Sequence, residues 1–208
     1  MDCQTEKNIL KNFEKRIFIV TISLFSLIVS FVCQKDAVFD KYTINDDVNQ
    51  YIFPFYRIQD QHLFQNDILT EYSLRHNAIG VVVIYSFWSK FFDSLLLSKL
   101  LPFILCFLSA MYVFLIGDKL YSAVVGFLSS FMFIGYSWTF HYFSGGHARA
   151  FAFPLLLSFI YYFIKDRYIV LGGILFLQIL FYPPIALISI FALCIVLYNS
   201  KRLMLYRA

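Results

Sequence analysis

Residues 95–116 read LLLSKLLPFILCFLSAMYVFLI, an apolar run with a single charged residue, Lys99. The hydrocarbon core of a bilayer is about 30 Å thick, and roughly twenty apolar residues of helix cross it. Other apolar runs of this kind recur along the chain, so the sequence predicts an all-α fold, one polytopic transmembrane helix bundle over residues 1–208. The predicted spans cover residues 17–33, 95–117, 121–140, 148–164, 168–182 and 184–198.

The composition excludes a soluble domain. Hydrophobic residues make up 60% of the chain, aromatic residues make up 21%, and the mean hydropathy is +0.70. The net charge of +4 does not indicate nucleic acid, because the Lys and Arg residues lie between the apolar runs instead of forming a stripe. We therefore expect membrane lipids, and no nucleic acid, as partners.

Two apolar regions have a second interpretation. Residues 17–33 resemble a signal peptide, but no small-x-small cleavage site accompanies them, so we expect an uncleaved anchor. Residues 168–198 are divided by Pro183 and Pro184, which is compatible with a tight hairpin of two short spans or with one kinked helix. We favour the hairpin.

The orientation depends on residues 78–92, an apolar stretch that is short for a span. If this stretch lies at the outer interface instead of crossing, nearly all cations beyond residue 100 fall on the cytoplasmic side, and only Arg149 lies outside. The cytoplasmic cations are then Lys119, Lys165, Arg167, Lys201, Arg202 and Arg207. The sequence thus predicts a multi-pass cell-membrane protein with a cytoplasmic N-terminus and an external loop at residues 34–94.

The external loop begins with a polar, aromatic-rich insert, residues 34–76, that contains the pair Asp46-Asp47. Val48, Ile52 and Phe55 follow at helical spacing, which predicts an amphipathic juxtamembrane helix lying on the membrane. One interpretation of the acidic pair is helix capping, since carboxylates are favoured in a first turn. The other is functional: a carboxylate that takes a proton from an acceptor hydroxyl or holds a metal ion.

A second predicted external loop, residues 141–149, reads HYFSGGHAR. Arg149 is suited to a lipid-linked phosphate, because a guanidinium forms paired hydrogen bonds with phosphate oxygens. The alternative for Arg149 is snorkelling to the interface. His141 and His147 are candidates for the same site or hydrogen-bonded interfacial rings, and Tyr182 is predicted on the same side of the membrane.

The order of these parts resembles the GT-C superfamily of polytopic glycosyltransferases, which use polyprenyl-phosphate-linked sugars. The matching features are a first span, an external loop that opens with an acidic pair, a juxtamembrane segment and a second external loop. Four segments together also look like a group of bacterial membrane proteins of this type, over roughly residues 15–200. These segments are Asp46-Asp47, LFQND at 63–67, GGHARAFAFP at 145–154 and FYPP at 181–184.

The resemblance implies an inverting sugar transfer on the outer face of the membrane. Asp46 or Asp47 would be the base on the acceptor hydroxyl, and Arg149 with His147 would neutralise the phosphate, while His141 and Tyr182 would complete the substrate site. A polyprenyl-phosphate-linked sugar would be the donor; a requirement for a divalent metal stays open, and no protein metal ligand is assigned. Superfamily members usually have more spans, so the chain is expected to be the N-terminal part of a larger GT-C-like module. The alternatives are a fragment, which could be inactive alone, a truncated reading frame, or half of a split protein with a C-terminal half as partner.

Two other classes of function stay open. A lipid or solute transporter or flippase would need charged residues or broken helices at mid-membrane depth, and the spans offer mainly Gln178 and the Pro183-Pro184 break. A non-enzymatic membrane scaffold would need the acidic insert only as a solvated cap.

Overall fold

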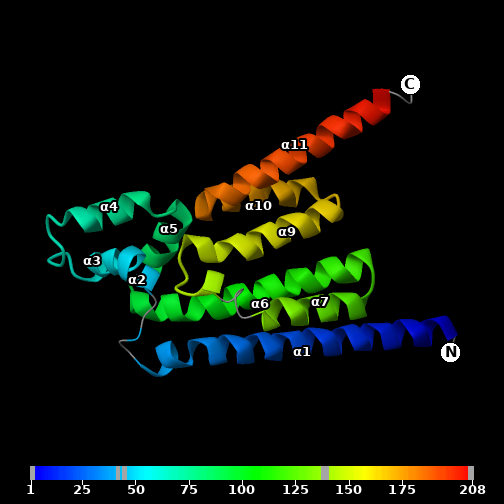
Figure 1. Cartoon of the computed structure of the whole chain (residues 1–208), viewed down its shortest axis with the longest axis horizontal. Helices are drawn as coiled ribbons and strands as arrows, with labels where there is room; N and C mark the ends of the chain where they lie inside the picture. The colour runs from blue at the N-terminus through cyan, green and yellow to red at the C-terminus, as the bar shows by residue number, and fades with distance from the viewer. Residues whose placement is uncertain (1–2, 41–42, 44–45, 137–140, 206–208) are drawn as a thin grey trace.

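The computed structural model describes residues 3–40, 43, 46–136 and 141–205, and within them the side chains of residues 3–11, 46–47, 49 and 199–205 are left out of the description (Figure 1). Every regular element in these ranges is helical, so the prediction of an all-α chain is confirmed. In chain order the elements are α1 (Cys3–Phe39), α2 (Asp46–Tyr51), η1 (Phe53–Phe55), α3 (Tyr56–Gln59), α4 (Ile68–His76), α5 (Ile79–Trp88), α6 (Ser94–Leu120), α7 (Ala123–Gly135), η2 (Ala148–Phe151), α9 (Ala152–Ile164), α10 (Tyr168–Phe181) and α11 (Pro183–Leu205).

Two of these helices are long and apolar enough to cross a membrane. They are Asn12–Phe39 within α1, with 28 residues, and Ser94–Leu120, with 27 residues. The other apolar helices are shorter; α7 ends at Gly135, and residues 137–140 of the predicted span lie outside the described residues. The first span was predicted to end at residue 33, but α1 stays helical to Phe39, within the start of the polar insert.

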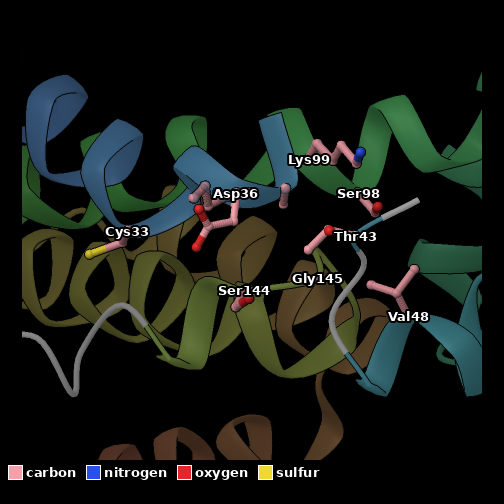
Figure 2. A pocket seen from close by; sticks show the side chains of 10 residues that line it. Cys33, Asp36, Thr43, Val48, Ser98, Lys99, Ser144 and Gly145 are labelled. Carbon is pink, nitrogen blue, oxygen red and sulfur yellow. The ribbon is translucent and has the colours of Figure 1, made fainter. Parts of the chain in front are cut away.

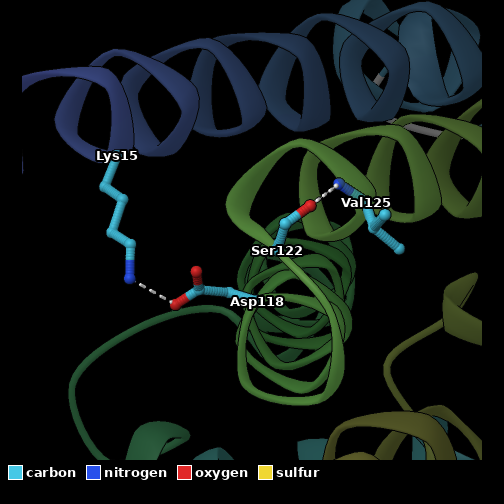
Figure 3. A network of polar contacts seen from close by, with 4 residues as sticks. All are labelled: Lys15, Asp118, Ser122 and Val125. Carbon is cyan, nitrogen blue, oxygen red and sulfur yellow. Dashed lines mark hydrogen bonds and ion pairs between the residues drawn. The ribbon is translucent and has the colours of Figure 1, made fainter. Parts of the chain in front are cut away.

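The long helices lie roughly side by side, with α1 at one edge and α11 at the other (Figure 1). α1 packs on α7 through two stacked aromatic pairs, Phe18–Phe127 and Phe25–Phe131, whose ring centroids are 4.7 Å and 4.1 Å apart. The Lys15 ammonium of α1 donates to the carboxylate of Asp118, near the end of α6, at 2.7 Å (Figure 3). Aromatic contacts and one ion pair thus join the first helix to the α6–α7 hairpin.

The α6–α7 hairpin turns at Ser122, whose hydroxyl accepts from the amide of Val125 and begins α7 (Figure 3). Beyond the turn, Gly117 of α6 and Gly126 of α7 face each other so closely that a Cβ on Gly117 would lie 2.6 Å from the Gly126 Cα. The two backbones can approach this closely only because neither residue carries a side chain. This contact aligns α7 along α6.

The short helices α2 to α5 gather around the start of α6 (Figure 1). Val48, Ile52 and Phe55 are fully buried in the main hydrophobic core, where Phe55 stacks on Tyr85 with ring centroids 5.1 Å apart. The periodicity therefore identified an apolar face, but protein covers this face, and it does not lie on the membrane as the sequence predicted. The apolar face packs on Tyr85 of α5 and on Leu97 and Leu101 of α6, and this packing removes it from water.

The predicted amphipathic helix is also interrupted. α2 ends at Tyr51, and a 3₁₀ turn with Pro54 follows before α3 begins at Tyr56. Proline has no amide hydrogen and disfavours a helical conformation in the residue before it, which explains the break.

At the other edge of the bundle, α10 and α11 are separate helices that reverse direction at Tyr182 (Figure 1). Tyr182 has an extended backbone, with φ −152° and ψ 82°, and its amide donates to the carbonyl of Gln178. The chain therefore forms a hairpin here and not one kinked helix. The reversal follows from Pro183 and Pro184, because two consecutive prolines cannot continue the hydrogen bonds of α10.

Candidate functional site

A polar pocket of about 230 Å³ lies where the end of α1, the start of α6, α2 and the turn at Ser144-Gly145 meet (Figure 2). α1 and its connection to α2 contribute Gln34, Asp36 and Thr43, and α6 contributes Ser98 and Lys99. Val48 of α2 and the 144–145 turn close the opposite wall. The pocket therefore joins four segments that are far apart in the sequence.

Lys99 supplies a positive charge at this pocket. Its ammonium donates to the backbone carbonyl of Asp40 at 3.0 Å, and the Thr43 hydroxyl donates to the Asp40 carboxylate at 2.7 Å. These hydrogen bonds tie the chain beyond α1 to the first turns of α6. They also hold Lys99, the single charge of the apolar run 95–116, at the edge of the pocket.

Gln34 is the most buried of the polar groups that α1 brings to the pocket. Its side chain is 6% exposed, and its Nε2 has no hydrogen-bond acceptor in the described part of the chain. A buried donor without an acceptor costs roughly 1–3 kcal/mol. Gln34 also lines the pocket, so this unpaired amide belongs to the wall of the polar cavity.

The 144–147 turn is built from two glycines in the left-handed region, Gly145 with φ 84° and Gly146 with φ 60°. Other residues rarely adopt this conformation. A Cβ on Gly145 would lie 3.1 Å from Cγ2 of Val48, so the turn packs directly against α2. The structure thus brings the segment after Asp46-Asp47 into contact with the glycine turn that precedes His147.

Tyr85 of α5 is hydrogen-bonded to the same turn. Its hydroxyl donates to the carbonyl of Gly146 at 3.2 Å, and the whole side chain is buried. Burial raises the pKa of Tyr85 well above its usual range, because the phenolate would lose its hydration. The phenol therefore stays protonated and remains a donor.

His147 and Arg149 follow this turn at the start of η2. The imidazole of His147 is buried and stacks on Tyr51 of α2, with ring centroids 5.7 Å apart and planes 10° from parallel. The guanidinium of Arg149 is half-buried and lies 5.8 Å from the centre of the Tyr142 ring, within range of a cation–π interaction. An aromatic ring thus lies against each basic side chain, and the ring on His147 belongs to α2.

Asp46 and Asp47 form the first turn of α2, directly before the pocket-lining residue Val48. Their side chains lie outside the described residues, as does Asn45, the predicted cap. The backbone alone places the start of α2 beside the pocket.

The other two predicted substrate-binding residues, His141 and Tyr182, do not line the pocket either. His141 is exposed in the helical segment before the glycine turn, and Tyr182 is half-buried between α10 and α11. The neighbour of Tyr182, Phe181, stacks on Phe151 of η2 at 4.4 Å, which places the α10–α11 reversal near η2. None of the predicted site residues with a described side chain lines the pocket itself.

Sequence reasoning did not predict Gln34, Ser98 or Lys99 as site residues. Lys99 carries a usable signal, because it is the single charge in the apolar run 95–116. Gln34 carries a weaker one, as the first polar residue after the first apolar run. Their common pocket depends on tertiary contacts between α1, α6 and the glycine turn, and spacing in the sequence contains no information about these contacts.

The pocket is suited to a hydroxyl-rich or phosphorylated ligand. Lys99 and Gln34 are donors, Asp36 is an acceptor, and the hydroxyls of Thr43, Ser98 and Ser144 can do both. The described residues contain no group of three or more His, Cys, Asp or Glu side chains able to hold a metal ion. Comparisons of the chain with protein-family models, with curated proteins and with solved structures find no match.

Proposed function

We propose that the chain is a multi-pass membrane protein with a cytoplasmic N-terminus and residues 34–94 outside. Two helices of spanning length and the exposure of large apolar side chains on the outer helices support this proposal. Val20, Leu24 and Ile28 of α1 and Leu187 and Phe191 of α11 are each more than half exposed. Contiguous apolar surface of this kind is unfavourable in water and favourable in lipid.

We further propose that the protein takes part in glycosyl transfer of the GT-C type, from a polyprenyl-phosphate-linked sugar to an acceptor hydroxyl. One observation carries the proposal: α2, which begins with Asp46-Asp47, packs against the glycine turn before His147 and Arg149, beside a polar pocket. An acidic pair and two basic side chains thus belong to segments that touch. Sugar transfer from a phosphate needs a base and a cation near each other.

In the proposed reaction, Asp46 or Asp47 accepts the proton of the acceptor hydroxyl. The acceptor oxygen forms a bond to the anomeric carbon while the bond from that carbon to the phosphate oxygen breaks. The polyprenyl phosphate leaves with the bonding electron pair, and Arg149 and His147 stabilise the negative charge that develops on it. The hydroxyl-lined pocket beside α2 accommodates the polar part of a substrate.

Replacing Asp46 and Asp47 separately by Asn tests this proposal. Transfer of a radiolabelled sugar from polyprenyl phosphate is measured in native membranes, where a C-terminal partner half would be present, and with the purified protein. Loss of the base is expected to lower the rate about 10²–10⁴-fold for one of the two variants, with the unfolding temperature retained. Asp60→Asn, an exposed residue of the same insert, is the matched control and keeps full activity.

Transfer that is unchanged in both variants would refute the catalytic role. A lower unfolding temperature with normal transfer would show that the pair only caps α2. The transporter alternative relies on Gln178 as a polar group at mid-membrane depth. This buried side chain donates to the carbonyl of Leu155 at 3.1 Å and so joins α10 to α9, which is a structural role.

A further inference from the structure

A second polar hollow lies at the other end of α6, between that end and the α9–α10 connection. Its volume is about 530 Å³. Three cations line it, Lys119 from α6 and Lys165 and Arg167 from the connection. Tyr162 and two apolar side chains, Ile164 and Val170, complete much of the wall. The proposed glycosyl-transfer site uses none of these residues.

The hollow has a positive balance of charge. One carboxylate, Asp166, lines it beside the three cations, and the Tyr168 hydroxyl donates to this carboxylate at 3.3 Å. The neighbouring carboxylate Asp118 is engaged from the other side, where it accepts from the Lys15 ammonium at 2.7 Å (Figure 3). Asp118 is therefore directed toward α1, and the hollow is complementary to an anion.

Lys165 is positioned by an aromatic ring. Its ammonium lies 4.6 Å from the centre of the Tyr161 ring, a cation–π geometry. A cation held against a ring loses less side-chain freedom on binding an anion than a fully mobile lysine does. The same ring thus helps to preform the hollow.

Exposed apolar side chains adjoin the cations. Ile169 is 95% exposed and Leu120 is 53% exposed, and Val170 lies in the wall of the hollow itself. A free anion would gain nothing from these side chains, whereas a molecule with a phosphate and a hydrocarbon chain would contact both kinds of surface. Basic pockets between membrane helices bind anionic headgroups by this combination of contacts.

We propose that this hollow binds an anionic phospholipid, with the headgroup phosphate on Lys119, Lys165 and Arg167 and an acyl chain along the exposed face of α10. The shared chemistry is that of a phosphate monoanion, and the apolar wall selects the lipid over free phosphate. The site depends on membrane insertion and is independent of sugar transfer. It fixes the depth and orientation of the α6 and α9–α10 ends in the bilayer.

Lipid titration of the full-length protein in detergent tests this site. Short-chain phosphatidylglycerol, phosphatidylcholine or inorganic phosphate is added, and bound lipid is counted by native mass spectrometry. Phosphatidylglycerol is expected to bind more tightly than phosphatidylcholine. Each cation removed by Lys119→Gln, Lys165→Gln or Arg167→Gln is expected to weaken it about fivefold, and the triple variant about a hundredfold.

The matched control removes three exposed cations elsewhere in the chain, through Lys35→Gln, Arg75→Gln and Lys90→Gln. This control triple variant has the same net charge and is expected to bind phosphatidylglycerol like the wild type. Equal weakening in both triple variants would overturn the proposal, because attraction would then follow net charge alone. Displacement of the lipid by millimolar inorganic phosphate would also overturn it, since the apolar wall would then contribute nothing. Lys165→Arg keeps the charge and is expected to retain binding, while circular dichroism checks the fold of every variant.

Discussion

At the scale of single residues, Gly146 allows the 144–147 turn to pack closely on α5 and α6. Its φ is 60°, and a Cβ at this position would lie 3.0 Å from the Cβ of Leu101 and 3.1 Å from the Tyr85 hydroxyl. A side chain here would therefore be strained and also too close to α5 and α6. The turn that leads to His147 and Arg149 can lie against the core only because residue 146 is glycine.

The Tyr85→Phe variant measures the hydrogen bond that holds this turn. Removing the hydroxyl leaves the Gly146 carbonyl without that buried donor, so the free energy of unfolding is expected to fall by about 1–2 kcal/mol. Chemical or thermal unfolding in detergent measures the change. Tyr136→Phe removes a hydroxyl from an exposed side chain and is expected to have almost no effect. Equal losses in the two variants would show that the Tyr85 hydroxyl does not stabilise the turn.

At the scale of helices, the packing of α7 on α6 depends on small residues. A Cβ on Gly126 would lie 2.5 Å from the carbonyl oxygen of Phe114, and this obstacle is backbone that cannot rotate away. Nearby, the Ser130 hydroxyl of α7 donates to the carbonyl of Ala110 of α6 at 2.9 Å. The two helices are thus joined by backbone proximity and by a buried hydrogen bond.

Gly126→Ala is expected to separate the two helices and to lower the free energy of unfolding by about 1–3 kcal/mol. Gly172→Ala in α10 is the matched control, because its Cβ would meet no atom within 4 Å. Alanine favours helix over glycine, so the control is expected to stabilise the protein by about 0.5–1 kcal/mol. Thermal unfolding of both variants gives the comparison. Stabilisation by both substitutions would contradict the close approach of α6 and α7.

The helices could be predicted from the sequence better than their surroundings. Long apolar runs require satisfied backbone hydrogen bonds, which is why residues 95–116 indicated the helix now seen as α6. The spacing of Val48, Ile52 and Phe55 correctly indicated one apolar face, but periodicity does not specify what covers a face, and α5 and α6 cover this one. Pro54 is the local signal for the break after α2, and the helical spacing of the apolar residues does not include it. The pocket at Gln34 and Lys99 depends on tertiary approach, which no local pattern encodes.

At the scale of the whole molecule, α6 connects two polar regions of different charge character. Its 27 residues correspond to about 40 Å of helix, somewhat more than the hydrocarbon thickness of a bilayer. The mixed pocket with Lys99 lies near its start, and the basic hollow with Lys119 lies at its end. An excess of cations at one end is typical of the cytoplasmic side of a membrane protein.

Cysteine accessibility tests this orientation. In a background with all four native cysteines replaced by alanine, Gln61→Cys marks the insert and Tyr121→Cys marks the far end of α6; both positions are exposed. In intact cells a membrane-impermeant maleimide is expected to label residue 61 and to label residue 121 only after permeabilisation, because α6 would separate the two sites by a bilayer. Labelling of both sites in intact cells would show that α6 does not cross the membrane. The reverse pattern would place the basic hollow outside and contradict a cytoplasmic N-terminus.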